Sequence, residues 1–235
     1  MIETHLVETE PSDGILPRPV PFSVVYEDDD ILVVDKPADT PIHPSIGNYE
    51  NTLANGIAWY FEQKGEPFVY RCINRLDRDT TGLIVLAKHA LSAAVLSQAM
   101  RSREIHRTYQ AFALGETAAS GTIDAPIARL NGSLIQRTVD FASGERSVTH
   151  YRTLAHCSVF SHLELNLETG RTHQIRVHMA YIGHPLLGDT LYNKTPGTFP
   201  RQALHSASLS FVHPITGEPL NFHAPLPEDM QNLLT

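Results

Sequence analysis

The residues most suited to chemistry lie in one short polar stretch, 75–82. It reads Arg-Leu-Asp-Arg-Asp-Thr-Thr-Gly and places Asp77 between Arg75 and Arg78. A carboxylate beside fixed cations is stabilised in its ionised form, and an ionised, positioned carboxylate can act as a nucleophile or a base. The same residue types also favour turns, and Arg–Asp pairs often only solvate a loop. Spacing alone therefore leaves a catalytic loop and an ordinary turn both open.

Other residues that could bind metals or nucleotides lack the usual spacing. His173 and His178 are five positions apart, which is poor helical register for two ligands on one face, and the chain has neither HExxH nor Cys-x-x-Cys. Asp77 and Asp79 are too close in one loop to flank a glycosidic bond as a hydrolase pair. No glycine-rich phosphate loop is present. We expect an activity without metal or cofactor.

Three segments together resemble the RluA family of pseudouridine synthases. Residues 74–83 are similar to the family pattern H-R-L-D-x-x-T-S-G-L, with Asn74 in place of the histidine and Thr81 in place of the serine. Residues 168–192 resemble T-G-R-T/S-H-Q-I/L-R-V-H followed by G-H-P-I/L-x-G-D and a later tyrosine. Tyr109 stands where the family carries K-x-Y-x-A. The resemblance covers about Phe22 to Pro227, in the family's order.

The resemblance implies the isomerisation of specific uridines to pseudouridine in structured RNA, either ribosomal or transfer RNA. Asp77 corresponds to the catalytic aspartate, and we leave open whether it attacks the ribose or the base. Arg176 corresponds to the basic residue that pairs with that aspartate. Tyr109 corresponds to a tyrosine that could stack on the target base and relay a proton. The target base would have to flip out of its stack to reach such a site.

Further basic residues are candidates for contact with RNA. Arg75 resembles the family arginine that fills space near the flipped nucleotide. Arg78, Arg171 and His173 are candidate phosphate or substrate contacts, although Arg171 and His173 could equally serve loop structure. The cluster Arg101, Arg103 and Arg107 could bind phosphate or form a solvated helix end.

Two other readings of the same residues stay open. One is a non-catalytic RNA-binding or RNA-folding module on the same fold, against which the joint presence of Asp77, Tyr109 and Arg176 weighs. The other is a nucleosidase that releases the base. Asn74 cannot become cationic, so any role of a charged histidine at that position is in doubt.

Composition and charge set limits on the partners. The 235 residues carry a net charge of −8, and residues 1–35 alone account for nine acidic residues against one basic. Residues 71–110 carry seven basic against three acidic residues, which predicts a local positive site rather than broad non-specific nucleic-acid binding. No apolar run approaches the roughly 18 residues of a membrane span, and no signal peptide is evident. We therefore expect a cytoplasmic monomer with RNA as partner and no membrane contact.

The hydrophobic pattern predicts an α+β fold with a central, mainly antiparallel sheet, flanking helices and, by family resemblance, a catalytic cleft. We expect a flexible N-terminal arm over residues 1–20 and a catalytic domain over residues 21–235. Helices are predicted for 51–63, 89–103 and 172–182. Strands are predicted for 23–27, 31–35, 68–74, 83–87, 107–114, 147–154, 159–167, 204–212 and 220–223.

Overall fold

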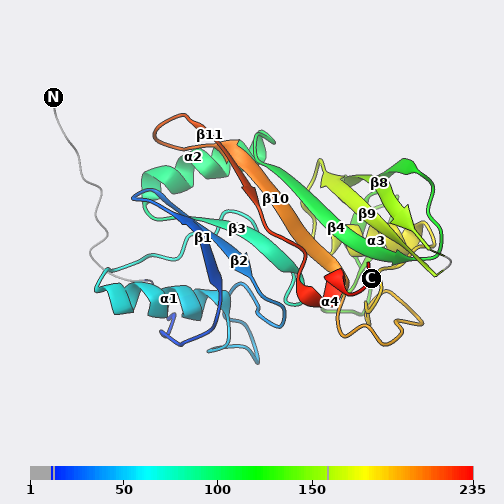
Figure 1. The fold of residues 1–235 in the computed structure, drawn as a ribbon, viewed down its shortest axis with the longest axis horizontal. Coiled ribbons are helices and arrows are strands. Elements are labelled where there is room, and N and C mark those ends of the chain that lie inside the picture. Colours follow the sequence, from blue (N-terminus) through cyan, green and yellow to red (C-terminus); the bar gives the residue numbers. More distant parts are fainter. Residues whose placement is uncertain (1–11, 13, 158, 235) are drawn as a thin grey trace. The chain divides into compact units, whose positions relative to one another are not determined.

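The computed structural model describes residue 12 and residues 14–157 and 159–234 (Figure 1). The chain divides into two compact units, Met1–Ile105 with Leu209–Ala224, and His106–Ser208 with Pro225–Thr235. Both units mix helices with mainly antiparallel strands, which confirms the predicted fold class. The expected arm over residues 1–20 stays a prediction, and residues 1–11 and 13 lie outside the described residues. Within the described ranges, no helix has the length and apolarity that a membrane span requires.

The first unit is built on three antiparallel strands, of which the second and third are buried on both faces. β1 (Ser23–Glu27), β2 (Ile31–Lys36) and β3 (Thr81–Ala87) pair antiparallel in chain order, and every residue of β3 is buried. Figure 1 shows α1 (Leu53–Lys64) and α2 (Ala90–Arg101) on opposite sides of these strands. β11 (Pro219–His223) and the end of β10 (Leu204–Val212) complete the unit.

One core of the first unit joins the strands to α2. Ile31, Val33, Leu83 and Val85, which alternate along β2 and β3, pack with Leu96 of α2. Alternate residues of a strand point to one face, so the remaining buried residues of β2 and β3 must face the other side. This explains why both strands read as continuous apolar runs.

The second unit contains a sheet in which β4 (His106–Leu114) is an inner strand, with a neighbour on each side. The strand order is β10-β4-β9-β8-β5, with β9 at Phe160–Leu167, β8 at Val148–His156 and β5 at Ser120–Asp124. A separate ribbon joins β6 (Ile127–Arg129) and β7 (Arg137–Val139). α3 (Gln174–Tyr181) packs on β7 and β8, and α4 (Glu228–Gln231) contributes Met230 to a second core with Phe112.

Most of the predicted elements are confirmed, but the strand over 68–74 is wrong. Its backbone makes bonds to β3 only at Arg71 and Ile73, and Cys72 forms a single isolated bridge. The next ladder position is taken by a side chain, because the Asn74 amide accepts from Val85 N at 2.9 Å and donates to Leu83 O at 3.1 Å. The short elements β5, β6, β7 and α4 were not predicted.

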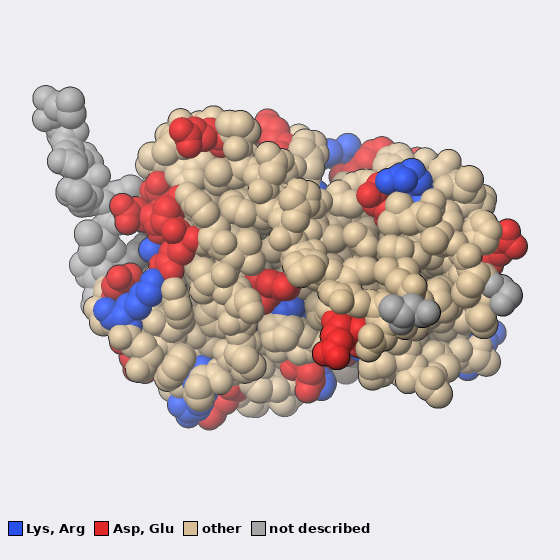
Figure 2. Space-filling model, in the orientation of Figure 1, with Lys and Arg blue, Asp and Glu red and all other residues tan. Residues whose placement is uncertain are grey.

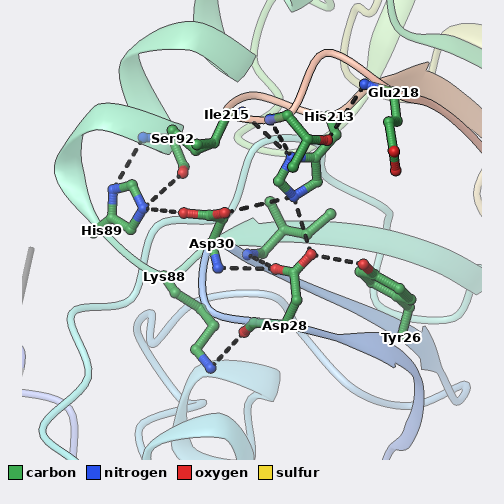
Figure 3. Close-up of polar contacts among 11 residues, drawn as sticks. Tyr26, Asp28, Asp30, Lys88, His89, Ser92, His213, Ile215 and Glu218 are labelled. Carbon is green, nitrogen blue, oxygen red and sulfur yellow. Dashed lines mark hydrogen bonds and ion pairs between the residues drawn. The ribbon is translucent and has the colours of Figure 1, made fainter. Parts of the chain in front are cut away.

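A partly buried hydrogen-bond network joins two turns of the first unit (Figure 3). Asp28 Oδ1 accepts from the backbone N–H groups of Asp30 and Ile31, both at 2.8 Å, and Asp28 Oδ2 accepts from Tyr26 Oη at 2.7 Å. His213, 185 positions along the chain, reaches the same Oδ2 through Nε2 at 3.0 Å. The network therefore ties the β1–β2 turn to the β10–β11 turn.

The hydrogen bonds assign the proton on each histidine of this network. His213 Nδ1 accepts from the backbone N–H groups of Ile215 and Thr216, so the proton of the neutral ring lies on Nε2. His89 Nδ1 accepts from Ser92 N, and its Nε2 reaches Asp30 Oδ1 at 2.7 Å. Asp28, Asp30 and His213 could geometrically hold a cation. However, His213 Nε2 donates a proton to Asp28 and offers no lone pair to a metal.

Asn74→Ala should lower the free energy of unfolding by about 1–3 kcal/mol, because two buried backbone groups of β3 lose their partner. Asn74→Asp should cost more, because a carboxylate would then face the Leu83 carbonyl. Urea unfolding measures both changes, with the exposed Asn131→Ala as the control. Equal stability of Asn74→Ala and Asn131→Ala would contradict this role.

Asp28→Asn should destabilise the protein at pH 7 by about 1–3 kcal/mol, because an amide N–H would face His213 Nε2–H or Tyr26 Oη–H. Burial disfavours ionised Asp28, but hydrogen bonds from Tyr26, Ile31 and Asp30 outweigh it and lower the pKa of the carboxyl. A lowered pKa gives stability that is present above the unfolded-state pKa of about 3.9 and is lost as pH falls through the folded-state pKa.

The difference in melting temperature between wild type and Asp28→Asn should therefore stay constant from pH 7 to about 4 and narrow as the pH falls further, through the folded-state pKa. Thermal melts at a series of pH values measure this difference. A difference that stays constant over the whole range would show that ionised Asp28 does not stabilise the network.

Candidate functional site

A buried lysine fixes the backbone of the loop that carries Asp77. Lys36 is fully buried, and its Nζ donates to the carbonyls of Pro37, Thr40 and Arg78 at 2.7, 3.0 and 2.8 Å. Thr80 N donates to Asp77 O at 3.1 Å, which closes a turn around Arg78 and Asp79. The backbone at Asp77 is thereby held between β3 and the segment that follows β2.

The two arginines beside Asp77 have different environments. Arg75 is exposed, so its side chain is open to contact with a substrate. Arg78 pairs with Asp39, to which its Nε donates at 2.6 Å, and it also lies 3.8 Å from Asp79. Hydrogen bonding to Asp39 raises the pKa of Arg78 further above its ordinary value. The Arg78 guanidinium is therefore shared between carboxylates before any RNA arrives.

In the second unit, Tyr109 lies in the middle of β4 and is almost completely buried, with 4% of its surface exposed. It stands opposite Leu165 of β9, and Tyr151 of β8 stands on the other side of that leucine. Residues paired in this way project from the same face of a sheet. Tyr109 is thus held by the sheet and not by a loop, which limits the positions its hydroxyl can take.

Arg176 lies on α3 and forms a bidentate ion pair with Asp189. Nε donates to Oδ2 at 2.8 Å and Nη2 donates to Oδ1 at 2.9 Å, and Asp189 is fully buried. Asp189 Oδ1 also accepts from the backbone N–H groups of Leu191 and Tyr192. The guanidinium lies over the Tyr192 ring, 5.1 Å from its centroid. Both its plane and its direction are therefore fixed.

Sequence reasoning missed Asp189 as a partner of Arg176, although the Gly-Asp at 188–189 belongs to the second signature segment. Gly188 has φ 67°, and a Cβ there would lie 1.9 Å from Arg201 O, so only glycine fits before this aspartate. The predicted pairing of Arg176 with Asp77 stays a prediction, because the two residues belong to different units.

Arg171 and His173 both make contacts within the second unit. Arg171 pairs with Glu145 at 2.6 Å and donates to Arg146 O. His173 adopts the left-handed conformation at the start of α3, with φ 59°, and its Nδ1 lies 2.7 Å from Tyr192 Oη. These contacts show the loop-structural role that the sequence left open, and a role in RNA contact stays a prediction for both residues.

His178, the last residue of the R-V-H segment, serves the core. It is fully buried, with Nδ1 2.9 Å from Thr149 Oγ1 and Nε2 2.8 Å from Ala125 O. Burial lowers the pKa of its ring, so the neutral form is favoured. Both nitrogens are engaged, and the residue fixes α3 against β8.

Comparisons with known proteins identify the family to which this chain belongs. The family described as RNA pseudouridylate synthase matches residues 30–181. The uncharacterized RNA pseudouridine synthase YjbO of Bacillus subtilis is 44% identical over 228 residues, which cover 97% of this chain and 80% of that protein. Ribosomal large subunit pseudouridine synthase D of Vibrio cholerae is 44% identical over 227 residues, covering 90% of this chain and 69% of that protein.

A solved structure shows the same fold. Human RNA pseudouridylate synthase domain containing 1 superposes with a TM-score of 0.74 at 26% identity, covering 88% of this chain and 84% of that chain. The sequence matches cover most of this chain and most of each relative. They include the segments in which Asp77, Tyr109 and Arg176 lie. The chain belongs to the RluA family of RNA pseudouridine synthases and is an enzyme of that class.

Proposed function

We propose that this enzyme converts specific uridines of large-subunit ribosomal RNA to pseudouridine, with Asp77 as the nucleophile. The observation that carries the choice of RNA is the 44% identity, over 90% of the chain, with a relative named for the large ribosomal subunit. A second such relative, from Escherichia coli strain K12, is 41% identical over 97% of the chain. Transfer RNA is the other substrate class that the family resemblance allows.

The reaction requires a nucleophile and a means of turning the base. The bond from ribose C1′ to uracil N1 breaks, a bond from C1′ to C5 forms, C5 loses a proton and N1 gains one. Asp77 supports this chemistry because its loop is held by Lys36 and by the turn to Thr80. A nucleophile held in place avoids part of the entropy cost of the attack. The target base must leave its stack, so base flipping belongs to the proposal.

Tyr109 and Arg176 supply the remaining functions. Tyr109 lies on a rigid strand and offers a ring for stacking and a hydroxyl for proton transfer. Arg176 is oriented by Asp189, and in this proposal it pairs with ionised Asp77. The nucleosidase alternative differs only in whether the base rejoins the ribose, so an assay for free uracil distinguishes it.

The charge distribution supports local rather than extended RNA contact. The net charge is −8, and Figure 2 shows acidic and basic side chains interspersed on the visible face, without a continuous basic surface. In the proposal, exposed Arg75 contacts the flipped nucleotide, and Arg78, Arg171 and His173 add further contacts to the RNA. Affinity should therefore depend on a small number of phosphates.

Asp77→Asn should reduce single-turnover conversion of uridine by roughly 10⁴-fold or more, because the amide keeps the shape but lacks a nucleophilic oxygen. RNA affinity should change by less than about tenfold, or about 1.4 kcal/mol. The substrate is unmodified large-subunit ribosomal RNA transcribed in vitro. Asp79→Asn is the matched control, since it removes one negative charge from the same loop.

Two outcomes would contradict the proposal at different levels. Near-normal turnover of Asp77→Asn would remove Asp77 as the nucleophile. Wild-type protein that converts uridine in transfer RNA but not in the ribosomal transcript would leave the chemistry intact and reject the choice of RNA.

Tyr109→Phe should lower the rate of conversion far more than RNA affinity, because the ring can still stack while the hydroxyl is lost. A reduction of roughly 10²-fold or more is expected for loss of a general acid or base. Tyr151→Phe, the residue across Leu165 in the same sheet, is the control and should retain the wild-type rate. If both variants turn over equally, the Tyr109 hydroxyl has no part in proton transfer.

A further inference from the structure

One basic side chain next to Tyr109 lacks the partner that its chemistry requires. Arg107 lies two positions before Tyr109 on β4, so the two side chains project from the same face of the sheet. Its Nε is shielded from solvent and has no hydrogen-bond partner among the described residues. A guanidinium carries five N–H donors and stays charged, and leaving a buried donor of a charged group unsatisfied is costly.

Three other arginines of the second unit pair with carboxylates. Arg146 pairs with Glu168 at 3.0 Å, Arg152 with Glu164 at 2.9 Å, and Arg171 with Glu145 at 2.6 Å. Arg107 has neither an ion pair nor a hydrogen bond from its side chain in the described ranges. The orphaned donor is thus particular to this arginine.

The guanidinium lies beside the turn that leads into α3. A Cβ placed on Gly170 would be 3.5 Å from Arg107 Nη2 and 3.7 Å from Nη1. Both terminal nitrogens of the guanidinium therefore lie next to Gly170. Arg107 therefore lies on the same strand as Tyr109, and its guanidinium lies beside the turn that carries Arg171 and His173.

We propose that Arg107 binds a phosphodiester oxygen of the RNA next to the target uridine and positions that nucleotide against Tyr109. This inference rests on the proposed function. A guanidinium fork matches two phosphate oxygens, and in this proposal the fork is formed by the two terminal nitrogens, Nη1 and Nη2. The buried Nε has no acceptor among the described residues, so no carboxylate of the second unit competes with a phosphate for this guanidinium.

Salt-dependent binding to the unmodified large-subunit ribosomal transcript tests the proposal. Arg107→Gln should weaken affinity by about tenfold and reduce the magnitude of the log affinity–log salt slope by about one. Arg152→Gln is the matched control, since it removes the same charge from an arginine that already has a carboxylate, and it should change neither quantity. Arg107→Lys should keep the slope but lose part of the affinity, because it retains the charge without the fork.

Thermal melts separate this role from a structural one. Arg107→Gln should melt no lower than wild type, since Nε has no partner to lose. An affinity and slope like those of Arg152→Gln would overturn the proposal, as would a lower melting temperature with unchanged affinity. If Arg107→Gln does not fold, Arg107→Lys decides the question, and an affinity equal to that of wild type would overturn it.

The proposed function can be contradicted without contradicting the role of Arg107. Wild-type protein that binds the transcript without converting uridine would reject the function, while the slope of Arg107→Gln would still decide whether Arg107 contacts phosphate.

Discussion

The buried ion pair between Arg176 and Asp189 organises the second unit around the predicted site. Asp189 is fully buried and accepts from two guanidinium nitrogens and from the backbone N–H groups of Leu191 and Tyr192. A buried charge is tolerated only when it is paired and its hydrogen bonds are complete. This one aspartate therefore fixes both the direction of Arg176 and the path of the chain after Gly188.

Tyr192, which lies against the guanidinium of this pair, links it to other segments by hydrogen bonds. Its hydroxyl accepts from Arg137 N at 2.9 Å, on β7, and lies 2.7 Å from His173 Nδ1, at the start of α3. Loss of Asp189 would thus release α3, the β6–β7 ribbon and the guanidinium together. We regard Asp189 as a positioning residue for Arg176, since it acts on the predicted site only through that side chain.

The first unit holds the loop of Asp77 by a different kind of bonding. Around this loop the contacts are those of Lys36 and Asn74 with backbone groups, which fix the main chain on which Asp77 lies. Asn74 explains how this chain differs from the family pattern at that position. Its amide offers a donor and an acceptor to the same strand, and these bonds do not require a positive charge.

The sequence alone determined the family, the α+β class and most strands and helices, because signature spacing and hydrophobic alternation are local properties. It failed where pairing depends on distant residues. The strand predicted over 68–74 is mostly irregular because the Asn74 side chain takes the place of backbone. The strands β6 and β7, of three residues each, carry too few residues to show a period. Only the tertiary structure showed Asp189 as the partner of Arg176 and the lack of a partner at Arg107, because hydrogen-bond partners depend on distance and direction in space.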